Sequence, residues 1–192
     1  MNKTVYITRN GLLEPLGQRQ VFSYLRGLSK SYSITLITYE KPGDWSDITR
    51  MQRAREDCEA YGIRWLPQQF RSSPKLIAPI FGMLRMMWLL RNEIKCNKIQ
   101  LIHARSYIPA AAALVVSRIS KVPFIFDMRA LWPEELITAG RLKRGSFIHR
   151  AIVMAERSCL KRSAAVISLT HAAAEYLQQE YPNELRDQRL VV

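Results

Sequence analysis

The sequence predicts an α/β fold in which helices cover both faces of a parallel β-sheet. Short β-branched runs, such as residues 5–8 (VYIT) and 34–38 (ITLIT), alternate with longer stretches of helical periodicity. Strands joined by helical crossovers form right-handed β-α-β units, and these units build parallel sheets. The hydrophobic fraction of 48% is enough for a packed core, which excludes a disordered chain.

Each element follows from its local pattern. The expected strands are residues 5–8, 34–38, 63–66, 99–103, 123–127, 165–169 and a last strand from 190. The expected helices are residues 18–29, 47–61, 74–95, 109–120, 146–162 and 172–179. Gly62 stands where the charged second helix needs a left-handed cap, and Ser146 is a typical N-cap for the helix that follows it.

Length and cysteine usage narrow the class of protein. A chain of 192 residues suits a single domain, so residues 1–192 are predicted to form one domain. The three cysteines are scattered, without a CxxC pair or a histidine at ligand spacing. This pattern favours reduced thiols in a cytoplasmic chain over a disulfide framework, and it predicts no metal site. The N-terminus lacks the pattern of a signal peptide.

The positive charge is concentrated in two windows. Residues 64–98 and residues 141–162 each carry seven basic side chains against one acidic side chain, and together they supply +12 of the formal net charge of +13. Such local excess favours contact with an anionic surface or a polyanionic ligand. Nucleic acid is not the expected partner, because no nucleic-acid-binding signature is present and aromatic residues do not alternate with the basic ones.

Ligands of parallel α/β sheets bind beyond the carboxyl ends of the strands, so polar residues there are the candidate site. The first such loop, residues 11–18, is not a GxGxxG fingerprint. Gly17 precedes a helix whose free N–H groups could bind a phosphate, or it is simply a glycine that a turn requires. His103, Arg105 and Ser106 end another strand. Arg105 could pair with a phosphate or carboxylate and His103 could donate to a developing charge, or Arg105 is a structural ion-pair partner.

The segment from residue 126 to 135 (FDMRALWPEE) has the same placement. Asp127 and Arg129 are two residues apart and could project together, either into a site or as a buried pair that holds the loop. Glu134 could open a short helix, and His171 follows a later strand that ends at the same edge. No nucleophile elbow, P-loop or Cys–His dyad is evident.

The apolar stretch from residue 76 to 90 predicts a helix with two kinds of contact. It contains Arg85 and is shorter than the ~20 residues that a membrane span needs. Trp88 and the basic flanks suit a helix that lies in an anionic membrane interface, while the alternative is a crossover helix packed on the sheet. We expect one face in the core and one face on the membrane. The expected membrane residues are Arg71, Lys75, Arg85, Trp88, Arg91 and Lys95.

Four segments together resemble the N-terminal Rossmann-like domain of the GT4 family of retaining glycosyltransferases, which have the GT-B fold. They are the Gly17 loop, residues 102–113 (IHARSYIPAAAA), residues 126–135 and residues 156–170 (ERSCLKRSAAVISLT). They occur in the family's order and cover most of the chain. In that family the N-terminal domain binds the acceptor, and a second domain binds most of the nucleotide-sugar. The resemblance implies that this second domain is absent here and that the chain alone transfers no sugar.

The resemblance also implies roles for the strand-end residues. His103, Arg105 and Asp127 would be catalytic; Ser106, Arg129, Glu134 and His171 would bind the acceptor; Gly17 and Gln18 would meet the donor diphosphate. The family often has a second histidine where Arg105 stands, so Arg105 favours an anionic acceptor such as a lipid-linked phosphate. No metal or other cofactor is expected, because the nucleotide-sugar is a co-substrate. The expected location is the cytoplasmic face of the cell membrane, and the alternative is a non-catalytic, membrane-associated binding or scaffold module in polysaccharide or glycolipid assembly.

Overall fold

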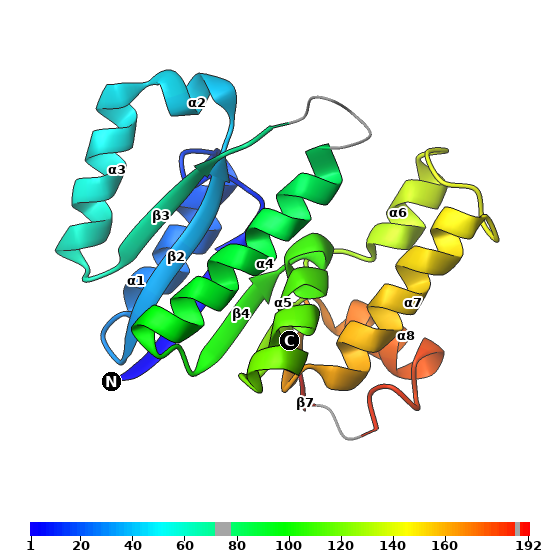
Figure 1. Cartoon of the computed structure of the whole chain (residues 1–192). Coiled ribbons are helices and arrows are strands. Elements are labelled where there is room, and N and C mark those ends of the chain that lie inside the picture. The colour runs from blue at the N-terminus through cyan, green and yellow to red at the C-terminus, as the bar shows by residue number, and fades with distance from the viewer. Residues whose placement is uncertain (72–77, 187–188) are drawn as a thin grey trace. The chain divides into compact units, whose positions relative to one another are not determined.

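The computed structural model describes residues 1–71, 78–186 and 189–192, and its strands and helices alternate along the chain (Figure 1). Among these residues the strands form a seven-stranded sheet in the order β3-β2-β1-β4-β5-β6-β7. The pairs β1–β2, β2–β3, β5–β6 and β6–β7 are parallel. The predicted α/β class, a Rossmann-like parallel sheet with helices, is therefore confirmed.

The chain divides into two compact units, Met1–His103 and Ala104–Val192, which are described separately below. The boundary falls inside strand β4 (Leu101–Arg105). The expectation of one domain with an absent second domain stays a prediction.

The first unit contains three complete strands and the helices that connect them. In chain order they are β1 (Asn2–Thr8), the π-helical segment η1 (Gly17–Phe22), α1 (Ser23–Leu28), β2 (Tyr32–Glu40), α2 (Pro42–Ser46), α3 (Ile48–Ala60), β3 (Arg64–Gln69) and α4 (Ala78–Asn97). Strand β2 pairs with β1 and with β3, so it is buried along nearly its whole length. Burial on both faces explains its continuous apolar pattern, and it also buries the polar Thr38 and Glu40.

The core of the first unit joins the sheet to the segments that cover it. Tyr6, Leu36 and Trp65 contribute from three neighbouring strands. They pack with side chains from the first loop and helix and from α3, namely Leu12, Leu13, Val21, Phe22, Leu25, Ala54 and Cys58. Val21, Phe22 and Leu25, in the range expected for the first helix, thus lie on its buried face.

The second unit follows the same alternation. It contains α5 (Tyr107–Ser120), β5 (Phe124–Asp127), α6 (Trp132–Thr138), α7 (Phe147–Arg162), β6 (Ala165–Ile167), α8 (His171–Glu180) and β7 (Arg189–Val191). Helix α5 is rich in alanine, and its alanines at 110, 112 and 113 are fully buried. The helix boundaries follow local chemistry, because Ser146 and Thr170 accept hydrogen bonds from the backbone N–H groups of His149 and Ala173. In the first unit Gly62 has φ +66°, as its predicted left-handed cap requires.

Candidate functional site

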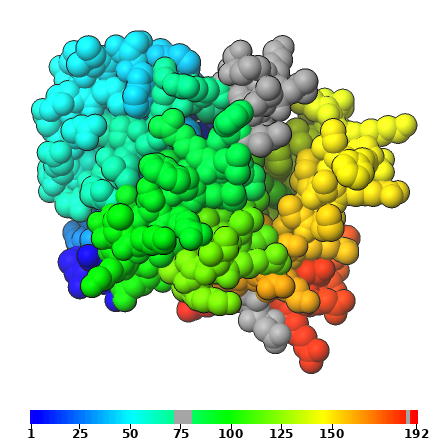
Figure 2. All heavy atoms as spheres, in the orientation of Figure 1, coloured from blue at the N-terminus to red at the C-terminus, as the bar shows by residue number. Residues whose placement is uncertain are grey.

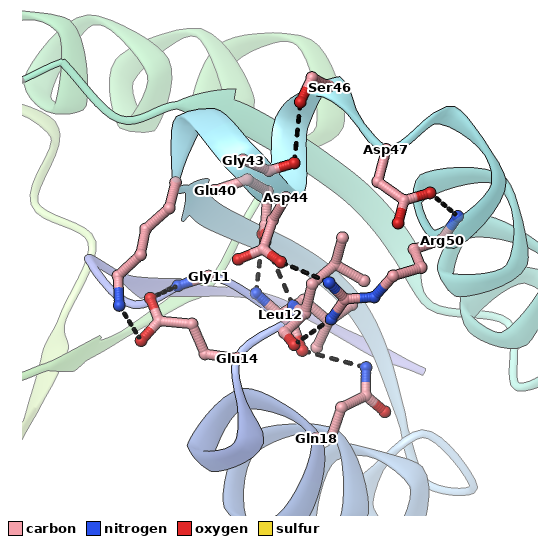
Figure 3. A network of polar contacts seen from close by, with 12 residues as sticks. Gly11, Leu12, Glu14, Gln18, Glu40, Gly43, Asp44, Ser46, Asp47 and Arg50 are labelled. Carbon is pink, nitrogen blue, oxygen red and sulfur yellow. Dashed lines mark hydrogen bonds and ion pairs between the residues drawn. The ribbon is translucent and has the colours of Figure 1, made fainter.

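The loop after β1 is held by a buried carboxylate from the next strand (Figure 3). Glu40 accepts hydrogen bonds from the backbone N–H groups of Leu12 (2.7 Å) and Leu13 (3.2 Å). It also accepts one from the Thr38 hydroxyl at 2.6 Å, and the Thr38 oxygen accepts one from the indole N–H of Trp65 at 2.8 Å. Burial removes water as a competing partner, so these bonds fix the loop to the end of β2.

A second set of contacts, made by Arg50 and Glu14, also holds the same loop (Figure 3). One guanidinium nitrogen of Arg50 donates to the Leu13 carbonyl at 2.9 Å, and another pairs with Asp44 at 2.6 Å. Glu14 accepts from the Gly11 N–H at 3.0 Å and lies 3.2 Å from the ammonium of Lys41. The loop is thus shaped by the protein itself before any ligand binds.

Both glycines of the loop are required by close packing. A Cβ at Gly11 would lie 2.5 Å from Glu40 Oε2, and a Cβ at Gly17 would lie 2.2 Å from the Gly11 carbonyl oxygen. Gln18 donates its backbone N–H to Glu14 O and its side-chain amide to Leu12 O, each at 3.0 Å. The structure therefore gives Gly17 and Gln18 a role inside the loop, and their contact with a donor diphosphate stays a prediction.

His103 ends the first unit in an aromatic environment. Its ring centroid lies 4.4 Å from that of Tyr6 and 6.0 Å from that of Tyr24. The side chain is buried. Packing against two aromatic rings restricts the orientation of the imidazole ring.

Tyr39, Gln68 and Phe70, at the ends of β2 and β3, were not identified from the sequence as candidate site residues. Tyr39 lies opposite Gln68 in the parallel register, and Gln68 accepts a hydrogen bond from Arg85 Nε at 3.0 Å. The Arg9 guanidinium lies over the Phe70 ring, 5.1 Å from its centroid. The hydroxyl of Tyr39 is buried and has no hydrogen-bond partner within the described residues, and burial raises its pKa to about 12. In the sequence Tyr39 looks like one more apolar strand residue, so no local signal separates it.

In the second unit the ends of β4 and β5 adjoin. The backbone N–H of Ser106 donates to the carbonyl oxygen of Asp127 at 2.8 Å. Ser106 has φ +74° and ψ 172°, a backbone conformation that costs about 1–3 kcal/mol in a residue other than glycine. Arg105 and Asp127 are both buried, and Arg129 lies 3.6 Å from the Asp127 carboxylate. The structure thus brings Ser106, Asp127 and Arg129 together, and the buried Arg105 directly precedes this turn. Their roles in a site stay predictions.

A buried carboxylate lies beneath this turn. Glu156 accepts hydrogen bonds from the hydroxyls of Tyr107 (2.6 Å) and Tyr181 (2.5 Å). Burial raises the pKa of Glu156 and the pKa values of both tyrosines. The Tyr107 ring also contacts Phe126 edge-on, at 5.4 Å between centroids. Because Tyr107 directly follows Ser106, this cluster fixes the start of α5 next to the strained turn.

The other two expected acceptor residues of this unit lie in the first turn of α6 and at the start of α8. The charge of Glu134 is close enough to Glu156 to add to the effect of burial in raising the pKa of that carboxyl. Glu134 forms an ion pair with Arg144, on the segment between α6 and α7. His171 is exposed at the start of α8. Their roles in acceptor binding stay predictions.

Helix α4 combines a buried and an exposed face, as the mixed expectation for this stretch requires. Met86 and Leu90 are buried. The exposed side chains include Phe81, Leu84, Arg85, Trp88, Arg91 and Lys95, and Arg85 also donates a hydrogen bond to Gln68. Arg71 is exposed, and Lys75 lies outside the described residues. No helix in the described part of the chain is long and apolar enough to span a membrane.

The described residues offer no obvious metal ligands. No three histidine, cysteine, aspartate or glutamate side chains among them are grouped closely enough to hold an ion. The buried carboxylates of Glu40 and Glu156 are instead occupied by hydrogen-bond donors of the protein. The strand ends carry arginine, histidine and serine side chains, which can bind anions and donate hydrogen bonds.

Comparison with known folds gives similar structures at low sequence identity. Sucrose-phosphate synthase from Thermosynechococcus elongatus has a TM-score of 0.63 at 8% identity, over 99% of this chain and 47% of that one. UGT89C1 from Arabidopsis thaliana complexed with quercetin has a TM-score of 0.60 at 13% identity, over 98% and 48%. A Listeria monocytogenes chain described as a UDP-N-acetylglucosamine 2-epimerase has a TM-score of 0.59 at 11% identity, over 93% and 42%. These similarities establish the fold, and the chain spans under half the length of each.

Sequence comparison identifies the family. No curated protein matches the chain. Residues 17–192 match the family described as glycosyl transferase 4-like domain. The match covers most of the chain and confirms the resemblance drawn from its motifs. The chain therefore belongs to the glycosyl transferase 4-like domain family.

Proposed function

We propose that this chain is the acceptor-side part of a retaining glycosyltransferase that moves a sugar from a nucleotide-sugar to an anionic, lipid-linked or glycan acceptor. The observation that carries the proposal is the group Arg105, Ser106, Asp127 and Arg129 at the carboxyl ends of two adjoining strands. Ligands bind at this edge in open parallel sheets. Membership of the glycosyl transferase 4-like domain family supplies the reaction class.

The donor in this proposal is a nucleotide-sugar. Structures with a similar fold include UGT89C1 complexed with UDP-L-rhamnose and Anabaena HepE in complex with UDP. In the proposed complex a further domain holds most of the donor, and the loop from Gly11 to Gln18 faces its diphosphate. On this account residues 1–192 alone transfer no sugar, and the reaction needs no metal ion from this chain.

In the proposed reaction this chain positions the acceptor and stabilises the charge that develops at the reacting centre. In retaining transfer of this kind the departing phosphate assists the incoming hydroxyl, so no dedicated base is required from the acceptor side. Arg105 pairs with the anionic group of the acceptor, and His103 donates to charge that develops at the reacting centre. Asp127 holds Arg129 and, through its backbone carbonyl, the turn at Ser106.

Substitution of Arg105 tests the proposal. Arg105→Lys keeps the charge but removes bidentate pairing, and Arg105→Ala removes both. The control is Arg118→Ala, at an exposed position of α5. With the complete gene product and lipid extract as acceptor, we expect KM for the acceptor to rise at least about tenfold for the lysine variant and more for the alanine variant. Equal kinetics for wild type, Arg105→Lys and Arg118→Ala would show that Arg105 does not bind the acceptor.

The exposed face of α4 is the proposed membrane contact of the first unit. It carries apolar Phe81, Leu84 and Trp88 followed by basic Arg91 and Lys95, the composition of an interfacial helix. Substituting Arg71, Arg91 and Lys95 with glutamate should weaken pelleting with anionic vesicles by about tenfold or more at moderate salt. Unchanged pelleting would exclude this face.

A further inference from the structure

Helix α7 (Phe147–Arg162) exposes an apolar stripe that packing within its own unit does not explain. Its inner face buries Glu156, Cys159 and Leu160. On the outer face Phe147 is 86% exposed, Ile148 64% and Met154 67%. The helix, yellow to orange in Figure 2, lies at the surface of its unit.

These residues form one continuous surface. With the exposed alanines they occupy positions i, i+1, i+4, i+7 and i+8 of the helix, which together form a single face. We name this set the α7 patch, and its members are Phe147, Ile148, Ala151, Met154 and Ala155. Single exposed apolar side chains are ordinary on a protein surface, but a contiguous stripe at helical spacing is typical of a binding surface.

The surroundings of the α7 patch are strongly basic. The segment from residue 141 to 162 has seven basic side chains, and its one acidic residue, Glu156, is buried on the opposite face. Arg144 and Arg157 pair with Glu134 and Glu184. Arg141, Lys143 and Arg150 are exposed and form no ion pair with any described residue.

We infer that the α7 patch inserts into the headgroup region of a bilayer that contains anionic lipids, with the surrounding basic residues on the lipid phosphates. Bulky apolar side chains flanked by Lys and Arg on an exposed helix are the composition of interfacial membrane helices. Each basic residue near such a surface adds attraction. A second copy of the chain is the poorer occupant, because it would place two net-positive patches against each other.

The inference depends neither on sugar transfer nor on α4. The α7 patch lies in the second unit and α4 in the first, so variants of the two helices report separately. Loss of binding in the α4 variant alone would overturn the role of the α7 patch and leave the proposed function standing.

Vesicle flotation of the complete gene product tests the apolar contact. The variant Phe147→Ser/Ile148→Ser/Met154→Ser removes the stripe, and the control Ile48→Ser/Ile119→Ser removes two other exposed isoleucines. The vesicles contain phosphatidylcholine with phosphatidylglycerol. Relative to wild type, the lipid concentration at which half of the protein is bound should rise at least about tenfold for the patch variant and less than about twofold for the control. Equal loss in both variants, or no loss in the patch variant, would overturn the inference.

A matched charge experiment tests the lipid class. The variant Arg141→Gln/Lys143→Gln/Arg150→Gln is compared with Arg19→Gln/Lys30→Gln/Arg53→Gln, which removes the same charge at exposed positions elsewhere. Only the first should weaken binding to anionic vesicles by about tenfold or more, and neither should change binding to phosphatidylcholine alone. Equal loss in both would indicate attraction by net charge only and would contradict a local site.

A probe at the patch distinguishes insertion from other occupants. Cys96 is the exposed cysteine and the other two are buried, so Cys96→Ser with Phe147→Cys gives one site for an environment-sensitive fluorophore. Its emission should shift to the blue on anionic vesicles, while a label at Ile48→Cys should not shift. A blue shift without vesicles that grows with protein concentration would indicate a second copy and would overturn the inference.

Discussion

The Glu40 carboxylate accepts a 2.7 Å hydrogen bond from the backbone N–H of Leu12, a residue 28 positions earlier in the chain. This bond joins the end of β2 to the loop after β1, and the neighbouring N–H of Leu13 uses the second carboxylate oxygen. The loop that the proposed donor diphosphate faces is thereby shaped by hydrogen bonds to a buried side chain of the protein itself. A ligand that binds there need not order the loop.

Glu40→Ala should destabilise the protein by at least about 2 kcal/mol, because it leaves two buried N–H groups without acceptors. The measurement is the free energy of unfolding in urea. Glu59→Ala, at an exposed position of α3, is the control and should change it by less than about 0.5 kcal/mol. Similar values for the two variants would show that the carboxylate does not hold the loop.

Substitution of two glycines in the same helical segment should have opposite effects. Gly17→Ala places a Cβ against the Gly11 carbonyl and should cost about 1–3 kcal/mol of unfolding free energy. Gly27→Ala meets no atom within 4 Å and should stabilise α1 by about 0.5–1 kcal/mol. Thermal denaturation of both variants measures the difference. A tolerated alanine at 17 would contradict the close approach seen here.

Tyr39→Phe should leave the unfolding free energy unchanged or raise it by up to about 1 kcal/mol, because the hydroxyl is buried without a hydrogen-bond partner within the described residues. Tyr107→Phe is the matched comparison and should lower it by about 1–2 kcal/mol, since its hydroxyl bonds Glu156. Urea denaturation at neutral pH distinguishes the two. Equal losses would mean that the Tyr39 hydroxyl has a stabilising partner in solution.

Glu156→Gln should alter the pH dependence of stability. Burial raises the pKa of Glu156 in the folded protein, so between its unfolded and folded pKa values the native state binds more protons than the unfolded state. Unfolding free energy attributable to this group is therefore fully present below the unfolded pKa and falls as pH rises through the folded one. Relative to wild type, the glutamine variant should gain stability from pH 4.5 upward in urea titrations. A constant difference between the two proteins would contradict the raised pKa.

Most of the fold follows from local patterns in the sequence. The strands, the caps at Gly62 and Ser146, and the placement of polar residues at the carboxyl ends of strands all depend on near neighbours in the chain. The differences are also local: α2 (Pro42–Ser46) was not expected, and β4 continues through Arg105 rather than ending at His103. His149 lies in the first turn of α7 and accepts a hydrogen bond from the Gly145 N–H.

The contacts that shape the candidate site could not be predicted from local sequence patterns. Glu40 meets Leu12 and Glu156 meets Tyr107 across 28 and 49 positions of sequence, and such pairings leave no periodic signal. A buried glutamate in a strand or on the inner face of a helix looks like a surface residue in composition. Tyr39 fits the apolar pattern of β2, so the sequence predicts an ordinary core residue. The pattern gives no sign that its hydroxyl lacks a hydrogen-bond partner within the described residues.

The most direct test of the account is transfer of label from radioactive nucleotide-sugars to lipid extract by the complete gene product. UDP- and GDP-linked sugars are supplied in separate reactions, with heat-inactivated protein as the control. We expect one donor to label a solvent-extractable product, with the anomeric configuration of the sugar retained, and residues 1–192 alone to give no label. Failure of every donor to label product above the inactivated control would contradict the assignment of this chain to sugar transfer.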